Sequence, residues 1–366
     1  MQNFNQHAGR RQILSLALAA AIRCSTISYL GSANAAEWAG HPSTVDQADW
    51  SAFLTRFVAP DGRVIDTGNG VISHSEGQGW GMFFAVVYDD PETFARISNW
   101  TSRTLRRDKD ALHAWRYVPS DDPPVRDTNS ATDADLFIAL ALARAARQWG
   151  RPDYARAAVA IARDVQRLLV GNAAGRTVLL PGARGFVTDR AVIINPSYYV
   201  LPAFSELAEL APSPIWAKLA SDGLALITAG RFGRWALPPD WLQISTRDGG
   251  LAPAPGWPPR FSYDAIRVPL YLAWGRQLPP AMREAFTAFW SSRPIPAIPA
   301  WVDLATDALA PYPGPPGFQA VAQLVLGDSQ SPPVAEPFPM VASAPDYYSA
   351  ALTMLAMIAS SELQRR

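Results

Sequence analysis

From Asp46 onward, the chain alternates apolar runs at helical spacing with loops rich in proline and glycine. The segment "ADLFIALALARAARQWG", residues 134–150, is typical, because an alanine-rich apolar stripe carries arginines on its outer face. Gly150 and Pro152 mark its end. The same pattern predicts helices over residues 46–58, 76–88, 92–106, 133–149, 153–170, 197–211, 213–230, 264–275, 280–292, 317–326 and 345–362.

Strand signals are few. The best are "TVLLPG" at 177–182 and "RAVIIN" at 190–195, which we expect to pair as a β-hairpin. Helices in sequential pairs with short turns bury one core most simply as concentric rings or as a stacked array. No repeat at a fixed period is present, which counts against a solenoid. The sequence therefore predicts an all-α fold without a linker between two domains.

Three stretches rich in proline, 236–260, 293–300 and 311–316, are too long to be tight connections. In a compact domain, long loops of this kind usually build a binding surface. We therefore expect them to contribute to a functional site.

The first thirty-five residues differ from the rest of the chain. Arg10 and Arg11 precede the short apolar run "ILSLALAAAI", and a small-residue A-x-A site follows at Ala33–Ala35. This order is typical of a secretory signal, with the arginine pair raising a twin-arginine route. The apolar run is too short to span a bilayer. We predict that residues 1–35 are a signal peptide, and that the mature protein is secreted or periplasmic without a membrane span.

Composition excludes several kinds of function. The 32 basic residues balance the 32 acidic ones, so the chain has no basic field to hold nucleic acid. Loss of the signal peptide and its three arginines leaves 29 basic against 32 acidic residues, a net charge of −3. Cys24 is the only cysteine and lies in that segment, and the four histidines lack ligand spacing. We expect neither a metal nor a cofactor.

Three acidic residues stand out because each opens a predicted helix: Glu76 in "SHSEGQGWGM", Asp133 in "NSATDADLFIA" and Asp264 in "FSYDAIRVPLYLAWG". One interpretation is helix capping, since Ser73 with Glu76 fits a capping box. Thr132 with Asp135 fits the same pattern. The other interpretation is catalysis, because inner helices of a barrel share one rim and can bring all three acids to one cleft.

The neighbours of these acids favour catalysis. Three glycines follow Glu76 and destabilise a helix by about 1 kcal/mol each, which is reasonable if a polymer approaches the backbone there. Burial against Trp80 and the charge of Asp133 would raise the pKa of Glu76. Arg267, one helical turn after Asp264, would keep that carboxylate ionised. One protonated acid and one ionised acid are what glycosidic hydrolysis requires.

Four segments in order resemble glycoside hydrolase family 8. "SEGQGWGM" is similar to the block with the proton donor, and "ATDADLFIALALARAARQW" to the signature segment of the family. "INPSYY" at 194–199 and "YDAIRVP" resemble two further blocks, so the match spans about 70 to 270. The resemblance implies that residues 36–366 form one (α/α)6 barrel with an inverting mechanism on β-1,4-linked glycans.

The resemblance also implies residue roles. Glu76 matches the general acid and Asp264 the general base. Asp133 matches the signature aspartate, for which gripping and distorting the sugar is the better role. The expected substrate-binding residues are Trp80, Trp115, Tyr198, Tyr199 and Arg267, with Arg267 and either tyrosine near the attacking water. For Trp115 and Trp149 the alternative is core packing, which we favour for Trp149.

Within this family, "YDAIRVPLYLAW" and "EGQGWGM" look most like secreted endoglucanases encoded beside bacterial cellulose synthases. The expected substrate is therefore a β-1,4-glucan, cellulose or cello-oligosaccharides, and a cellulose synthase complex is an expected partner. The alternatives are a xylanase, a chitosanase, or a non-catalytic glycan-binding subunit of a synthase complex. The complete set of three acids argues against the last, since binding alone does not require it.

Overall fold

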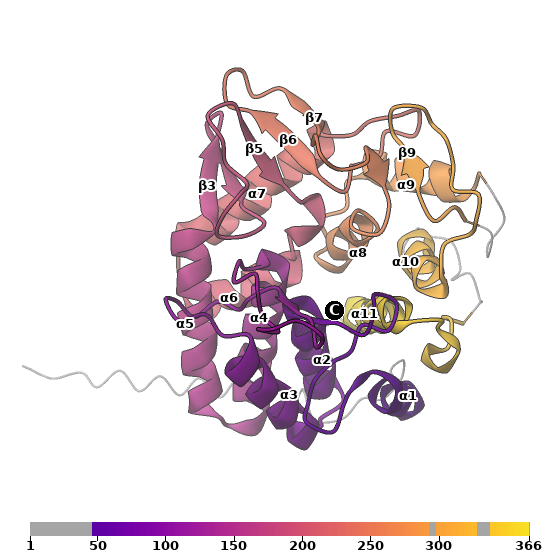
Figure 1. Cartoon of the computed structure of the whole chain (residues 1–366). Coiled ribbons are helices and arrows are strands. Elements are labelled where there is room, and N and C mark those ends of the chain that lie inside the picture. Colours follow the sequence, from indigo (N-terminus) through magenta and orange to yellow (C-terminus); the bar gives the residue numbers. More distant parts are fainter. Residues whose placement is uncertain (1–45, 293–297, 328–336, 366) are drawn as a thin grey trace, which may run out of the picture.

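The computed structural model describes residues 46–292, 298–327 and 337–365, and this part of the chain is predominantly helical (Figure 1). Its helices agree with the predicted ones to within a few residues at either end. Their bounds are α1 (Gln47–Phe57), α2 (Ser75–Val87), α3 (Pro91–Thr104), α4 (Thr132–Trp149), α5 (Pro152–Leu168), α6 (Leu201–Leu210), α7 (Pro214–Ala229), α8 (Arg267–Trp274), α9 (Pro280–Trp290), α10 (Pro316–Gly327) and α11 (Tyr347–Gln364).

The helices divide into inner and outer ones. Helices α2, α4, α8 and α11 are buried around nearly their whole circumference, whereas α3 and α5 bury a single face. A helix that is apolar on all sides belongs in the interior, and an amphipathic one covers it. Inner α2 packs against outer α3, and inner α4 against outer α5. Consecutive helices thus form inner and outer pairs, as expected for a barrel.

The two ends of the described chain meet and close the ring. In Figure 1 the indigo start and the yellow end lie side by side, and α11 contacts both α1 and α2. Arg56, in the last turn of α1, donates hydrogen bonds to the carbonyl oxygens of Val341 at 2.9 Å and Ala344 at 2.5 Å. These bonds hold the segment before α11 against the first helix.

The glycines after Glu76 serve helix packing and not polymer approach. A Cβ on Gly79 would lie 3.1 Å from the backbone oxygen of Ala134, and one on Gly81 would lie 2.9 Å from Val64. Both glycines are buried, so α2 can approach α4 and the preceding loop closely. The prediction that these glycines admit a substrate is therefore wrong.

The strands are short, of two to four residues each. Strand β3 (Val170–Ala173) pairs with β4 (Arg176–Leu179), while β5 (Ala191–Ile194) pairs with β6 (Leu242–Ser245). The predicted hairpin between 177–182 and 190–195 is wrong, because each segment has a different partner. The remaining strands are β1 (Ser73–His74), β2 (Arg116–Tyr117), β7 (Leu251–Pro253), β8 (Arg260–Phe261) and β9 (Val302–Asp303); β1 pairs with β2, β6 with β7 and β8 with β9.

Within the described residues, none of the helices has the length and apolar character needed to cross a membrane. The predicted signal peptide, residues 1–35, lies outside the described residues. Its presence and its cleavage remain predictions.

Candidate active site

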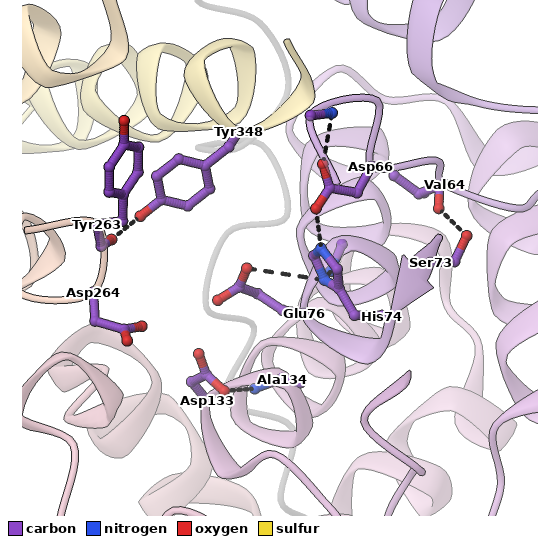
Figure 2. Close-up of polar contacts among 12 residues, drawn as sticks. Val64, Asp66, Ser73, His74, Glu76, Asp133, Ala134, Tyr263, Asp264 and Tyr348 are labelled. Atoms are coloured by element: carbon purple, nitrogen blue, oxygen red, sulfur yellow. Dashed lines mark hydrogen bonds and ion pairs between the residues drawn. The ribbon is translucent and has the colours of Figure 1, made fainter. Parts of the chain in front are cut away.

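Glu76 lies in the first turn of α2, but it takes no part in a capping box. His74 is the N-cap residue, and its Nδ1 accepts a hydrogen bond from the backbone N–H of Gly77 at 3.0 Å. Ser73 instead donates to the carbonyl oxygen of Val64 at 2.6 Å. The capping interpretation of Glu76 is therefore wrong, and Figure 2 shows its carboxylate directed toward Asp133 and Asp264.

His74 links α2 to the preceding loop. Because its Nδ1 accepts from the backbone, the ring hydrogen of the neutral side chain resides on Nε2, which lies 3.3 Å from Oδ2 of Asp66. The carboxylate of Glu76 lies 3.9 Å from Nδ1 (Figure 2). Asp66 thus fixes the ring that caps α2 beside the candidate acid.

Asp133 lies in the first turn of α4 and is almost completely buried. Its Oδ1 accepts a hydrogen bond from the backbone N–H of Ala134 at 2.9 Å. The expected capping box is absent from this helix start, because Thr132 donates to the carbonyl oxygen of Leu180 and Asp135 accepts from His113. The other carboxylate oxygen of Asp133, Oδ2, lies 3.2 Å from Nη1 of Arg267 on the side of the cleft.

Asp264 does not open a helix as predicted. It lies in the turn between β8 and α8, three residues before the helix begins at Arg267. Its backbone oxygen accepts from the N–H of Arg267 at 3.1 Å. The turn still points its carboxylate toward Glu76 and Asp133 (Figure 2).

Arg267 joins the three acids. Its Nη2 lies 2.6 Å from Oδ1 of Asp264, and its Nη1 lies 3.2 Å from Oδ2 of Asp133 and contacts the carboxylate of Glu76. Nη2 also donates to Oγ of Ser197 at 3.0 Å. Residues almost 200 positions apart thus share one guanidinium, which has three carboxylates around a single positive charge.

This excess of negative charge favours retention of a proton. Burial raises the pKa of Asp133 to about 7, although the N–H of Ala134 opposes the shift. Burial, followed by the charges of Asp240 and Asp133, raises the pKa of Asp264 well above its ordinary value. The latter direction is opposite to the one predicted from Arg267 alone. The cluster therefore keeps a proton at a pH where isolated carboxylates have lost theirs.

The three acids line a cleft with a volume of about 490 Å³. Trp115, Tyr198 and Arg267, all expected to bind substrate, lie along it. Trp115 is 36% exposed, and its Nε1 donates to Asp127 at 2.7 Å, so the indole is fixed with an open surface. The lining residues are Asp66, Gly68, Asn69, Ile72, His74, Glu76, Trp115, Ala131, Asp133, Tyr198, Tyr263, Asp264, Arg267, Asp346 and Tyr348.

Two expected substrate-binding residues belong to the core instead. Trp80 has no exposed surface and packs beneath the site against Phe137 and Tyr347. Tyr199 is 2% exposed, and its hydroxyl accepts from the N–H of Leu179. Neither side chain can touch a substrate in this structure, so both predictions are wrong.

Trp149 lies at the far end of α4, about 24 Å from Asp133 by the rise of a helix. It packs on Phe94 and donates to Asp89. The core-packing interpretation favoured for Trp149 is confirmed.

Sequence reasoning missed several residues of the cleft. The four histidines lack the spacing of metal ligands, but the position of His74 two residues before Glu76 is a usable signal of a role in the site. Tyr348, from α11, donates its hydroxyl to the carbonyl oxygen of Tyr263 and so joins the last helix to the turn of Asp264 (Figure 2). No local sequence pattern predicts that Tyr348 or Asp66 lies in the cleft.

Among the described residues, no group of three or more histidines and acids is arranged to hold a metal ion.

Comparison with known proteins agrees with this geometry. The family model "Glycosyl hydrolases family 8" matches residues 21–362. The chain is 48% identical to a probable endoglucanase of Novacetimonas hansenii over 88% of its length and 92% of that protein. It is 41% identical to an endoglucanase of Cellulomonas uda, covering 78% of this chain and 79% of the relative. The solved structure of an endo-β-1,4-glucanase from Acetobacter xylinum matches with a TM-score of 0.82 and 48% identity, covering 87% of this chain and 98% of that one.

A helical barrel with three acids at one end, and matches of this extent, define an enzyme that cleaves glycosidic bonds. The chain belongs to glycoside hydrolase family 8. The all-α (α/α)6 barrel predicted from the sequence is confirmed.

Proposed function

We propose that this protein is an endo-1,4-β-glucanase that hydrolyses β-1,4-glucan with inversion at the anomeric carbon. The observation that carries the proposal is the meeting of Glu76, Asp133 and Asp264 around Arg267 in one cleft. The endoglucanases of Novacetimonas hansenii and Cellulomonas uda, which this chain resembles over most of its length, support the choice of glucan.

Glu76 acts as the general acid. It donates its proton to the glycosidic oxygen as the bond from that oxygen to the anomeric carbon breaks. Asp264 acts as the general base on the opposite face of the sugar and removes a proton from the attacking water. The raised pKa of Asp264 suits this role, because a carboxylate with a higher pKa is a stronger base once it is ionised.

Asp133, Arg267 and the aromatic residues hold the substrate and the reacting groups. Asp133 has an oxygen directed to the cleft between the acid and the base, where it can grip sugar hydroxyls. Arg267 orients all three carboxylates. Trp115 offers an indole face for a pyranose ring, and Tyr198 lies beside the base. Tyr263 and Tyr348 complete the wall on the side of α11.

Hydrolysis of three polymers tests the choice of substrate. On carboxymethyl cellulose we expect reducing ends to appear and viscosity to fall early, as internal cleavage requires, with much lower rates on xylan and chitosan. Faster hydrolysis of xylan or chitosan would contradict the choice of glucan and identify that polymer as the substrate. Binding of cello-oligosaccharides without any hydrolysis would instead support a non-catalytic glycan-binding subunit.

The stereochemistry of the product tests inversion. Proton NMR during the first minutes of cello-oligosaccharide hydrolysis is expected to show the α-anomer at the new reducing end, because water attacks opposite the leaving group. Early appearance of the β-anomer would mean retention and would require a covalent intermediate on one of the acids.

The cellular role is a further part of the proposal. An exported enzyme of this specificity can trim nascent cellulose in the periplasm or outside the cell, beside a cellulose synthase complex. The support is the sequence order of residues 1–35 and the resemblance described above. N-terminal sequencing of the exported protein, with Ala36 as the expected first residue, tests the export step.

A further inference from the structure

A third aspartate stands behind the candidate base. Asp240 lies in the proline-rich stretch 236–260, just before β6, and it is not among the residues that line the cleft. Its backbone N–H donates to the carbonyl oxygen of Arg260 at 2.7 Å, which anchors it to β8. Asp240 therefore belongs to the support of the site and not to its substrate-contacting surface.

The carboxylate of Asp240 clamps the turn that carries Asp264. Its Oδ1 accepts from the backbone N–H of Ser262 at 3.0 Å and of Ala265 at 2.8 Å. Its Oδ2 accepts from Oγ of Ser262 at 2.7 Å. The donors lie on both sides of the base in sequence, so Asp240 fixes the backbone from which the side chain of Asp264 projects.

The charge of Asp240 also acts on the base. Burial raises the pKa of both carboxyls, and among the neighbouring charges that of Asp240 contributes most to the raised pKa of Asp264. The polar side chains of Trp241, the next residue, and of Asn195 lower the pKa of Asp264 and oppose this effect. The ionisable groups that face Asp264 are Glu76 from α2, Asp133 from α4, Tyr198 from the short helix at 196–198, Arg267 from α8, Tyr348 from α11 and Asp240 itself.

We propose that Asp240 is a positioning residue that holds the turn of Asp264 and, through its negative charge, makes Asp264 a stronger base. This inference rests on the proposed function, in which Asp264 activates water. Asparagine at this position can still accept two N–H bonds and donate to the serine hydroxyl, so it removes the charge while keeping the clamp. Alanine removes both.

The test is the pH profile of kcat/KM on carboxymethyl cellulose. In Asp240→Asn the acid limb is expected to move to lower pH, because Asp264 ionises more easily without a negative neighbour. The plateau of kcat is expected to fall by up to about tenfold, since the base is weaker, with KM unchanged. In Asp240→Ala, kcat is expected to fall about 10²-fold, because the base is also misplaced.

Asp303 provides the matched control. It accepts from two backbone N–H groups and one hydroxyl in the turn after β9, as Asp240 does, but it faces no catalytic carboxylate. Asp303→Asn should leave the pH profile unchanged.

Ser262→Ala keeps the charge of Asp240 and loses one hydrogen bond of the clamp. In this variant kcat should fall while the acid limb stays in place. The same variant tests the inference if the Asp240 variants do not fold.

Two results overturn the inference while the enzyme remains an endoglucanase. One is a profile of Asp240→Asn that superimposes on that of the wild type. The other is an unchanged kcat in Ser262→Ala. A wild-type protein that hydrolyses none of the three polymers contradicts the proposed function itself and removes the basis of the inference with it.

Discussion

Replacement of Glu76 by glutamine is expected to lower kcat by about 10²–10⁴-fold, the usual contribution of a general acid. Glutamine has nearly the same shape but carries no acidic proton for the leaving oxygen. Binding of cello-oligosaccharides should remain within a few-fold of wild type, because Trp115 and Asp133 are unchanged. Steady-state kinetics and calorimetric titration with cello-oligosaccharides measure the two effects separately.

Glu92 is the matched control for this substitution. It also lies in the first turn of a helix, α3, but it is exposed and pairs only with Arg96 on the same helix. Glu92→Gln should leave kcat unchanged. If Glu76→Gln retained most of its activity, the proton donor would have to be sought elsewhere in the cleft, with Asp133 as the first candidate.

The helices and the meeting of the acids were predictable from sequence because both depend on local signals. Apolar stripes at helical spacing mark the helices, and Gly150 adopts the left-handed conformation that ends α4. The four motif segments, read with the common rim of a barrel, predicted that Glu76, Asp133 and Asp264 converge. The order of the four motif segments along the chain, together with a known type of fold, was sufficient to predict this convergence.

The orientation of individual side chains was not predictable, because it depends on which neighbours the helix faces. Trp80 follows Glu76 by four residues, yet its indole packs against Tyr347 of α11, more than 250 residues away. Tyr198 and Tyr199 are adjacent, but one lines the cleft and the other enters the core. Strand β5 likewise pairs with a segment about 50 residues further along the chain.

The charge partners and protonation of the site residues were the features least predictable from the sequence. From the sequence, Arg267 was expected to pair with Asp264 alone, at a helical spacing. In the structure it also pairs with Glu76 and Asp133, and the charge of Asp240 reaches Asp264 from a stretch without any recognisable motif. The protonation of the site therefore depends on long-range contacts that no local pattern contains.

Arg267→Met is expected to destabilise the fold by about 3–5 kcal/mol, because it leaves the buried carboxylate of Asp133 and the half-buried ones of Glu76 and Asp264 without their partner. Arg267 is the only arginine or lysine among the described residues that line the cleft. Activity should also fall, since acid and base lose their common anchor. Thermal unfolding measures the stability, and kcat of the folded fraction at low temperature measures the activity.

The loss of stability in Arg267→Met should grow with pH. Asp133 has a pKa of about 7 in the folded protein, raised above its value of 3.8 in a model compound. The folded state therefore binds more protons than the unfolded state between these values, and the stability contributed by this group falls as pH rises through 7. Without Arg267, ionisation of the buried acids is more costly, so the deficit should be smaller at pH 5 than at pH 8.

Arg144→Met separates stability from catalysis. Arg144 is also buried and pairs with two carboxylates, Glu206 and Glu362, but it lies in the second half of α4 and lines a different cavity. The substitution Arg144→Met should lower the unfolding temperature while the folded fraction keeps its kcat. If Arg267→Met likewise kept its kcat, or lost the same stability at pH 5 and pH 8, the shared guanidinium would be a structural element and not the group that sets the charge of the acids.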